Sequence, residues 1–159
     1  SAPCVNNFVE AGTRTIVGVW ANAYDTRPGH DNNGVGCLEN GCAPKLTRDG
    51  VVDDIESMWS CAQSIVPDGG FCEIEFTFAN PQDVVDIQVA FLYEADSARQ
   101  LEVAVNGEVV RTFTSYLQPW VTFNGLGVKK SEVRTVTLRH TYTDKHEWIN
   151  ILEVRFSKT

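Results

Sequence analysis

The feature that most constrains this fold is a hairpin signal in the middle of the chain. Two β-rich runs, 100–105 and 108–114, flank the pair Asn106-Gly107. Both residues of the pair readily adopt the positive φ values of a two-residue type I′ turn, which joins adjacent antiparallel strands. The sequence therefore predicts an antiparallel β-structure around this turn.

Other β-rich segments follow one another along the chain, and none has the periodicity of a long helix. Residues 72–78 alternate between apolar and polar, which is typical of a strand with one buried face. Residues 80–83 (Asn-Pro-Gln-Asp) predict a turn, followed by a more buried strand over 84–93. Further strands are expected over 15–20, 120–123, 133–140 and 148–156.

About eight short strands at roughly ten-residue spacing, without an internal repeat, are typical of an antiparallel β-sandwich. We expect one all-β domain over residues 1–159, of jelly-roll type with long loops. The longest loop is expected over residues 21–44, which are rich in Gly, Asn, Asp and Pro. A loop of this length in a compact domain is usually functional or disordered.

Five cysteines in a short chain indicate disulfides rather than a zinc site, because no C-x2-C spacing occurs. Disulfides indicate an oxidising compartment, so we expect a secreted, extracellular protein. The favoured pairs are Cys37–Cys42 within the long loop and Cys61–Cys72 between consecutive strands. Cys4 is then left over. Spacing alone does not determine this connectivity.

Residues 45–60 (KLTRDGVVDDIESMWS) combine four acidic side chains with an Asp-Gly turn and a buried-type tryptophan. Ca²⁺ takes six to eight oxygen ligands, many from backbone carbonyls, and a glycine lets the backbone fold inward to offer them. Two interpretations remain open at this point. The stretch is either a calcium-binding turn or a solvated acidic loop before a strand.

Charge and composition exclude several functions. The net charge of −8 and pI near 4.8 argue against a nucleic-acid partner, since phosphates select basic surfaces. No run approaches the roughly 20 apolar residues of a membrane span. The start Ser1-Ala2-Pro3 lacks a signal peptide, as expected for a mature secreted chain. The chain contains no G-x-S-x-G, H-E-x-x-H or phosphate-binding loop, which favours a non-catalytic role.

Three blocks of sequence occur in order: Asp49-Gly50 with Ser57-Met58-Trp59, then residues 90–99 leading into the hairpin, then residues 147–154 (EWINILEV). Together they resemble the discoidin, or coagulation factor 5/8 type C, domain. The likeness is to its galactose-binding-like carbohydrate-binding modules, of the kind attached to alginate-lyase-type enzymes. The chain departs from the family in a longer Asp-Gly to Trp spacing and in Asn150, where the family favours serine.

The resemblance implies a structural Ca²⁺ that joins the Asp-Gly turn to the last strand. Carried over, its ligands are the Asp49 carboxylate, a backbone carbonyl near Val52, the Ser57 hydroxyl and carbonyl, and the Glu153 carboxylate. Glu153 supports this independently, because a carboxylate beside closely spaced apolar residues is costly if buried and unpaired. A surface position for Glu153 is the alternative.

A sugar site on such a module would lie in loops at one end. It would combine an aromatic platform with polar or charged partners for hydroxyls and carboxylates. The candidate ligand-binding residues are Tyr24, Arg27, His30, Asp96, Arg99, Trp120 and Tyr142. Each has a plainer role: Arg99 can pair with Asp96, and Trp120 can pack in the core. His140 and His146 flank a polar turn and can be simply solvated, and Trp148 more often anchors the last strand.

Three functions follow, in order of preference. The first is a non-catalytic module, a monomer or part of a larger protein, that binds a polysaccharide. An arginine fork suits a uronic-acid carboxylate, so alginate or another uronan is expected, with a galactose-type polymer as the other option. The second is a small polysaccharide lyase that uses β-elimination, for which residues 139–146 contain suitable residue types. The third is a cell-surface adhesion module.

Overall fold

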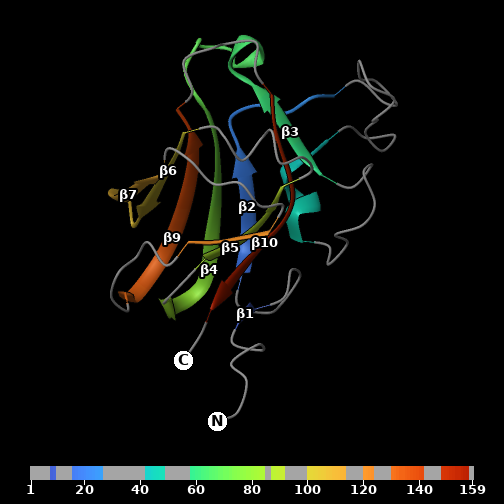
Figure 1. Cartoon of the computed structure of the whole chain (residues 1–159). Coiled ribbons are helices and arrows are strands. Elements are labelled where there is room, and N and C mark those ends of the chain that lie inside the picture. Colours follow the sequence, from blue (N-terminus) through green and yellow to red (C-terminus); the bar gives the residue numbers. More distant parts are fainter. Residues whose placement is uncertain are drawn as a thin grey trace.

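The computed structural model describes residues 8–9, 16–26, 42–48, 58–84, 87–91, 100–113, 120–123, 130–141 and 148–157. These residues form two antiparallel sheets that enclose one core, so the predicted β-sandwich is confirmed (Figure 1). The described strands number ten rather than about eight. No helix among these residues has the length and apolar character needed to cross a membrane.

The first sheet, sheet A, is built on the last strand of the chain. Its order is β1-β10-β5-β8, and β3 pairs with the beginning of β10. The bounds are β1 (Phe8–Val9), β3 (Trp59–Ala62), β5 (Ile87–Phe91), β8 (Trp120–Phe123) and β10 (Trp148–Ser157).

The second sheet, sheet B, has the order β2-β4-β9-β6-β7. Two short 3-10 helices, η1 (Pro44–Arg48) and η2 (Gln63–Ile65), flank β3 in the sequence. The bounds are β2 (Ile16–Ala21), β4 (Cys72–Val84), β6 (Leu101–Val105), β7 (Glu108–Phe113) and β9 (Lys130–His140).

The core lies between the inward faces of β4 and β10. As the alternation predicted, Ile74, Phe76 and Phe78 of β4 are buried. The rings of Phe76 and Phe78 meet Phe156 of β10 edge to face, at centroid distances of 5.4 Å and 5.2 Å. Such pairs contribute about 0.5–1.5 kcal/mol beyond their buried area, so one ring of sheet A is held by two of sheet B.

The turn predicted over residues 80–83 is wrong. These residues belong to β4, which runs without a break from Cys72 to Val84. The register against β9 shifts between Thr77 and Gln82, and again between Gln82 and Val84. A strand can hold Pro81 at such an irregularity because no ladder hydrogen bond needs its missing N–H.

One predicted disulfide is confirmed. Cys61 of β3 and Cys72 of β4 are bonded, and their Cα atoms are 6.1 Å apart. The bond joins sheet A to sheet B, because β3 pairs with β10 and β4 lies within sheet B. Cys42 is also disulfide-bonded, and its partner lies outside the described residues, as do Cys4 and Cys37.

The predicted hairpin is confirmed, and its turn also clamps a neighbouring strand. Asn106 and Gly107 adopt φ values of 51° and 82° between β6 and β7. The Oδ1 of Asn106 accepts from the backbone N–H of Arg134 at 2.7 Å and of Thr135 at 3.2 Å. Its Nδ2 donates to the carbonyl of Glu132 at 3.1 Å, where β9 takes a positive φ of 58°.

Substituting Asn106→Ala should lower the free energy of unfolding by about 1–3 kcal/mol. It removes three hydrogen bonds and places a residue without a polar side chain in the left-handed region. Asn106→Asp keeps both hydrogen bonds that the side-chain oxygen accepts, so its free energy of unfolding should fall by less. Urea unfolding of the three proteins measures this, and equal stability of the alanine and wild-type proteins would contradict the clamp.

Candidate functional site

The most closely held loop segment follows β2 and is anchored by Trp59. The side chain of Trp59 is 0% exposed, and its indole Nε1 donates to the carbonyl of Ala23 at 3.0 Å. The N–H of Asp25 donates to the carbonyl of Ser60 at 2.8 Å. The backbone on both sides of Tyr24 is therefore attached to β3.

Asn22 attaches the same segment to sheet B. Its Nδ2 donates to the carbonyl of Phe71 at 2.7 Å, and its Oδ1 accepts from the N–H of Glu73 at 3.0 Å. Its own N–H donates to the carbonyl of Glu73 at 3.2 Å. Tyr24 thus projects from a segment that both sheets hold, which limits the entropy lost when a ligand contacts it.

Residues 42–48 lie across a surface hollow from the segment that carries Tyr24. The N–H of Cys42 donates to the carbonyl of Asp25 at 2.7 Å, and the carbonyl of Cys42 accepts from the N–H of Ser60 at 3.4 Å. The hydroxyl of buried Thr47 donates to the carbonyl of Pro44 at 2.7 Å and closes the first turn of η1. This short helix packs against β2, β3 and β10.

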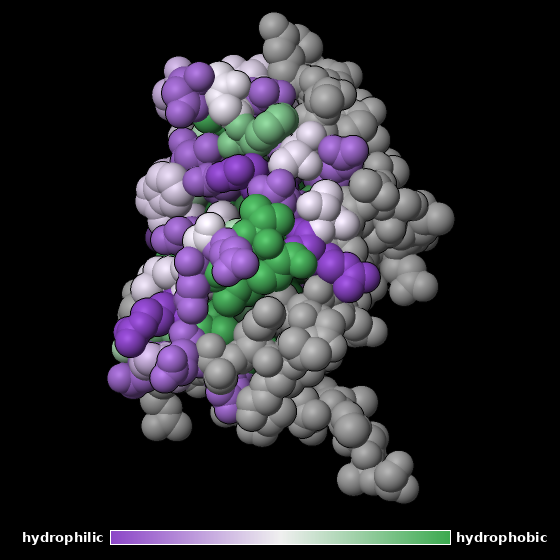
Figure 2. Space-filling view, turned by 90° about the vertical axis from the view of Figure 1, so that its left-hand side faces the viewer, coloured by the Kyte–Doolittle hydropathy of each residue, from purple (hydrophilic) through white to green (hydrophobic). Residues whose placement is uncertain are grey.

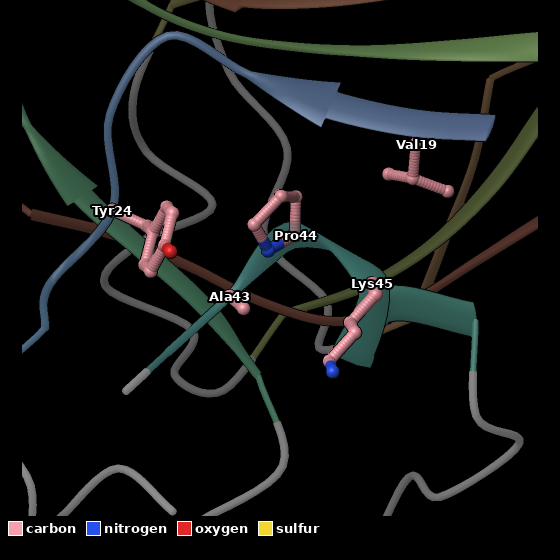
Figure 3. A pocket seen from close by; sticks show the side chains of 5 residues that line it. All are labelled: Val19, Tyr24, Ala43, Pro44 and Lys45. Atoms are coloured by element: carbon pink, nitrogen blue, oxygen red, sulfur yellow. The ribbon is translucent and has the colours of Figure 1, made fainter. Parts of the chain in front are cut away.

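Between these segments lies an open hollow of about 320 Å³, lined by Val19, Tyr24, Ala43, Pro44 and Lys45. Figure 3 shows Tyr24 and Lys45 flanking Ala43 and Pro44, with Val19 projecting from β2. Tyr24 is 36% exposed, and Lys45 is exposed as well. We name this the Tyr24–Lys45 hollow. It offers an aromatic ring, an apolar floor and one cation.

The structure places only part of the predicted ligand-binding set. Tyr24 lines the hollow. Trp120 begins β8, where its backbone pairs with Ala90, and its side chain is not among those described. The other predicted contacts lie outside the described residues: Arg27, His30, Asp96, Arg99 and Tyr142.

The structure also shows the burial of two residues, His140 and Trp148, whose exposure the sequence left open. The interpretation of His140 as a solvated residue is wrong, because it is buried on the inward face of β9 opposite Cys72 and Leu101. Trp148 is half-buried and starts β10, paired with Ala62. Sequence reasoning missed Lys45 as a site residue, since a lysine preceding an acidic stretch has no pattern that indicates a ligand.

Glu153 occupies the interior, which excludes the surface alternative. Its side chain is 0% exposed on β10, and Nε of Arg155 lies 4.0 Å from its Oε2. The other expected calcium ligands, Asp49, Val52 and Ser57, lie outside the described residues. Within the described part of the chain, no three His, Cys, Asp or Glu side chains cluster as a metal site would require.

The chain on either side of residues 49–57 is fastened next to Glu153. Before this segment, η1 packs on β10. After it, Met58 is buried in a cluster with Leu152, and Trp59 pairs with Ile151.

Comparison with solved structures identifies the same fold in carbohydrate-binding modules. The family 32 module of AlyQ, in complex with 4,5-unsaturated mannuronic acid, is 19% identical, with a TM-score of 0.63 over 91% of this chain and 96% of that one. A pectin-binding module is 18% identical, with a TM-score of 0.60 over 91% of each chain. The family 32 module of Clostridium perfringens NanJ in complex with galactose is 10% identical, with a TM-score of 0.58 over 89% of this chain and 97% of that one.

These likenesses confirm the discoidin-like, galactose-binding type of β-sandwich that the sequence resembles. No protein-family model and no curated protein matches the sequence. The fold is therefore established by structure alone, and the chemistry rests on the residues of the site.

Substituting Trp59→Phe should lower the free energy of unfolding by about 2–4 kcal/mol, because it opens a cavity and leaves the Ala23 carbonyl without its donor. Trp20→Phe is the matched control and should change stability by less than about 0.5 kcal/mol, since Trp20 is exposed. Hydrogen exchange at the Asp25 amide should accelerate only in Trp59→Phe. Unchanged exchange there would show that Trp59 does not hold this segment.

Proposed function

We propose that the protein is a non-catalytic carbohydrate-binding module and that the Tyr24–Lys45 hollow is its sugar-binding site. The observation that carries this proposal is the exposed ring of Tyr24, which projects from a hydrogen-bonded backbone segment into a hollow that Lys45 also lines. A flat aromatic ring stacks on the apolar face of a pyranose, while a charged neighbour orients the sugar. The shared fold with carbohydrate-binding modules supports the same function.

The charge of the hollow favours an acidic sugar. Lys45 is its cation, in a chain whose net charge of −8 otherwise repels polyanions. A lysine ammonium can pair with the carboxylate of a uronic acid, whereas a neutral hexose would leave that charge unused. We propose a uronan as the ligand, with alginate first. The AlyQ and pectin-binding neighbours support this class, and the NanJ neighbour supports galactose as the alternative.

The disulfides support a role outside the cell, because such bonds persist in oxidising compartments. Modules of this fold occur beside catalytic domains, as in the solved AlyQ fragment with family 32 and alginate lyase domains. We propose that this module likewise brings a larger protein, or its own chain, to a polysaccharide.

Tyr24→Ala should weaken binding of an alginate oligosaccharide by about tenfold, through loss of the stacking surface. Lys45→Met should weaken it by about threefold to tenfold and reduce its salt dependence. Lys45→Arg keeps the charge and should stay within about twofold. Titration calorimetry at low and high salt measures all three.

A neutral galactose oligosaccharide in the same titrations separates the two sugar classes. Equal affinity for it in wild-type and Lys45→Met protein is expected, since no carboxylate is present. Tight alginate binding that Tyr24→Ala leaves unchanged would place the site elsewhere. The appearance of an ultraviolet-absorbing unsaturated product during the titration would contradict a non-catalytic role.

We further propose that Ca²⁺ is held between the acidic turn and β10, by Asp49, a carbonyl near Val52, Ser57 and Glu153. Support comes from the complete burial of the Glu153 carboxylate and from the attachment of both neighbouring segments to β10. The β3–β10 pairing ends at Trp59–Ile151. Bound there, the cation would offset the cost of burying this carboxylate and tie the turn to the sandwich.

Saturating Ca²⁺ should raise the melting temperature by about 5–10 °C relative to EDTA, as binding to the folded state alone requires. Glu153→Gln should abolish this difference. Glu75→Gln, a carboxylate on the opposite, solvent-facing side of sheet B, should retain it. Identical melting of the wild-type protein with Ca²⁺ and with EDTA would reject the site.

A further inference from the structure

A second, chemically different surface lies on the solvent-facing side of sheet B. Register pairs Trp20 with Glu75, Glu75 with Thr137, and Thr137 with Ala104 across β2, β4, β9 and β6. Residues opposite one another in adjacent strands point to the same side, with Cβ atoms about 5 Å apart. Trp20 and Glu75 therefore stand next to each other on this outer face.

Trp20 is the dominant apolar feature of this face. It is 54% exposed, which is more than the other large hydrophobic residues of the described chain. Gly18, two residues earlier on the same side of β2, has open space where a side chain would lie. The ring of Trp20 is thus accessible at the edge of the sheet, where a flat ligand can reach it.

A second row on the same face carries three charges. Arg139 contacts Glu73 at 3.0 Å and Glu102 at 3.4 Å, so one guanidinium bridges two carboxylates. Glu75 accepts from the hydroxyl of Thr137 at 3.4 Å. With three carboxylates and one guanidinium, these rows carry a formal charge of −2. Figure 2, viewed from the side of β6, β7 and β9, shows hydrophilic residues around a hydrophobic patch in the middle of the described surface.

The outer face is separate from the Tyr24–Lys45 hollow. Val19 lines the hollow, and successive side chains of a strand point to opposite sides. Trp20 therefore projects away from the hollow, although the two residues are neighbours in β2. The two surfaces also differ in charge, because Lys45 marks the hollow and Glu75 stands beside Trp20.

We propose that the outer face of sheet B binds a cationic amino-sugar polysaccharide, a polymer of glucosamine with free amino groups. An indole face attracts an ammonium and also stacks on a pyranose ring. The adjacent Glu75 carboxylate pairs with that ammonium, and its negative neighbours exclude a uronan by repulsion. Thr137 supplies a hydroxyl beside Glu75, which suits a polyhydroxylated ligand better than a peptide. Only the choice of a polysaccharide class rests on the proposed function.

Calorimetric titration of the whole protein with a fully deacetylated glucosamine tetramer, at mildly acidic pH where its amines are protonated, tests this proposal. Wild-type protein should bind it, and Trp20→Ala and Glu75→Gln should each weaken binding by about threefold to tenfold. Val109→Ala removes another exposed apolar side chain of the same face, 49% exposed, and should have no effect because β7 lies at the opposite edge of sheet B from Trp20.

The comparison ligands decide what is recognised. The N-acetylated tetramer should bind at least about fivefold more weakly, because it lacks the positive charges. Equal binding of both tetramers, equal binding of tetralysine, or no binding of any of them would overturn the proposal. Tyr24→Ala should leave glucosamine binding intact while weakening alginate binding. If alginate does not bind at the Tyr24–Lys45 hollow but glucosamine binds as expected, only the proposed function is rejected. If alginate binds there but glucosamine does not bind, only the outer-face proposal is rejected.

Discussion

The buried indole of Trp59 is the contact on which the functional end of the molecule depends. Its ring fills the core, and its one polar atom reaches the carbonyl of Ala23, a residue before Tyr24. Two residues farther along β3, Cys61 is bonded to Cys72 of the other sheet. A short strand thus performs two tasks, since it joins the sheets covalently and fixes the segment that carries the exposed tyrosine.

The arrangement explains how a rigid binding surface forms at the edge of a sandwich. The backbone N–H and C=O groups of a loop can be buried only where they find hydrogen-bond partners. Here, residues 22–25 and Cys42 are hydrogen-bonded to each other and to β3 and β4, which replaces the ladder a strand would provide. The resulting site keeps its shape because the scaffold, rather than the ligand, orders it.

Sequence patterns predicted most of the fold because its strands alternate and its central turn has an unambiguous chemistry. Asn106-Gly107 and the buried series in β4 are local signals, and both are confirmed. The failure at residues 80–83 has a physical reason: Pro81 is tolerated in β4 where the register shifts, and only the pairing with β9 reveals this. The burial of His140 depends likewise on its register opposite Cys72.

The candidate site was less accessible to sequence reasoning. Tyr24 was predicted from its residue type, but Lys45 and Pro44 join it only through hydrogen bonds between distant segments. Trp20 gave no functional signal, because an aromatic residue in a β-branched strand is ordinarily core. Its exposure follows from the alternation that sends Val19 inward. The two sides of β2 therefore face surfaces of different charge, with the cation Lys45 in the hollow and carboxylates on the outer face of sheet B.

Amide chemical shifts during titration with an alginate oligosaccharide test the central claim most directly, because they locate the ligand without any substitution. The proposed site predicts that the largest changes fall on residues 22–26 and 42–45, with little change at Glu75 and Thr137. The largest changes on the outer face of sheet B, or no changes at either surface, would contradict it.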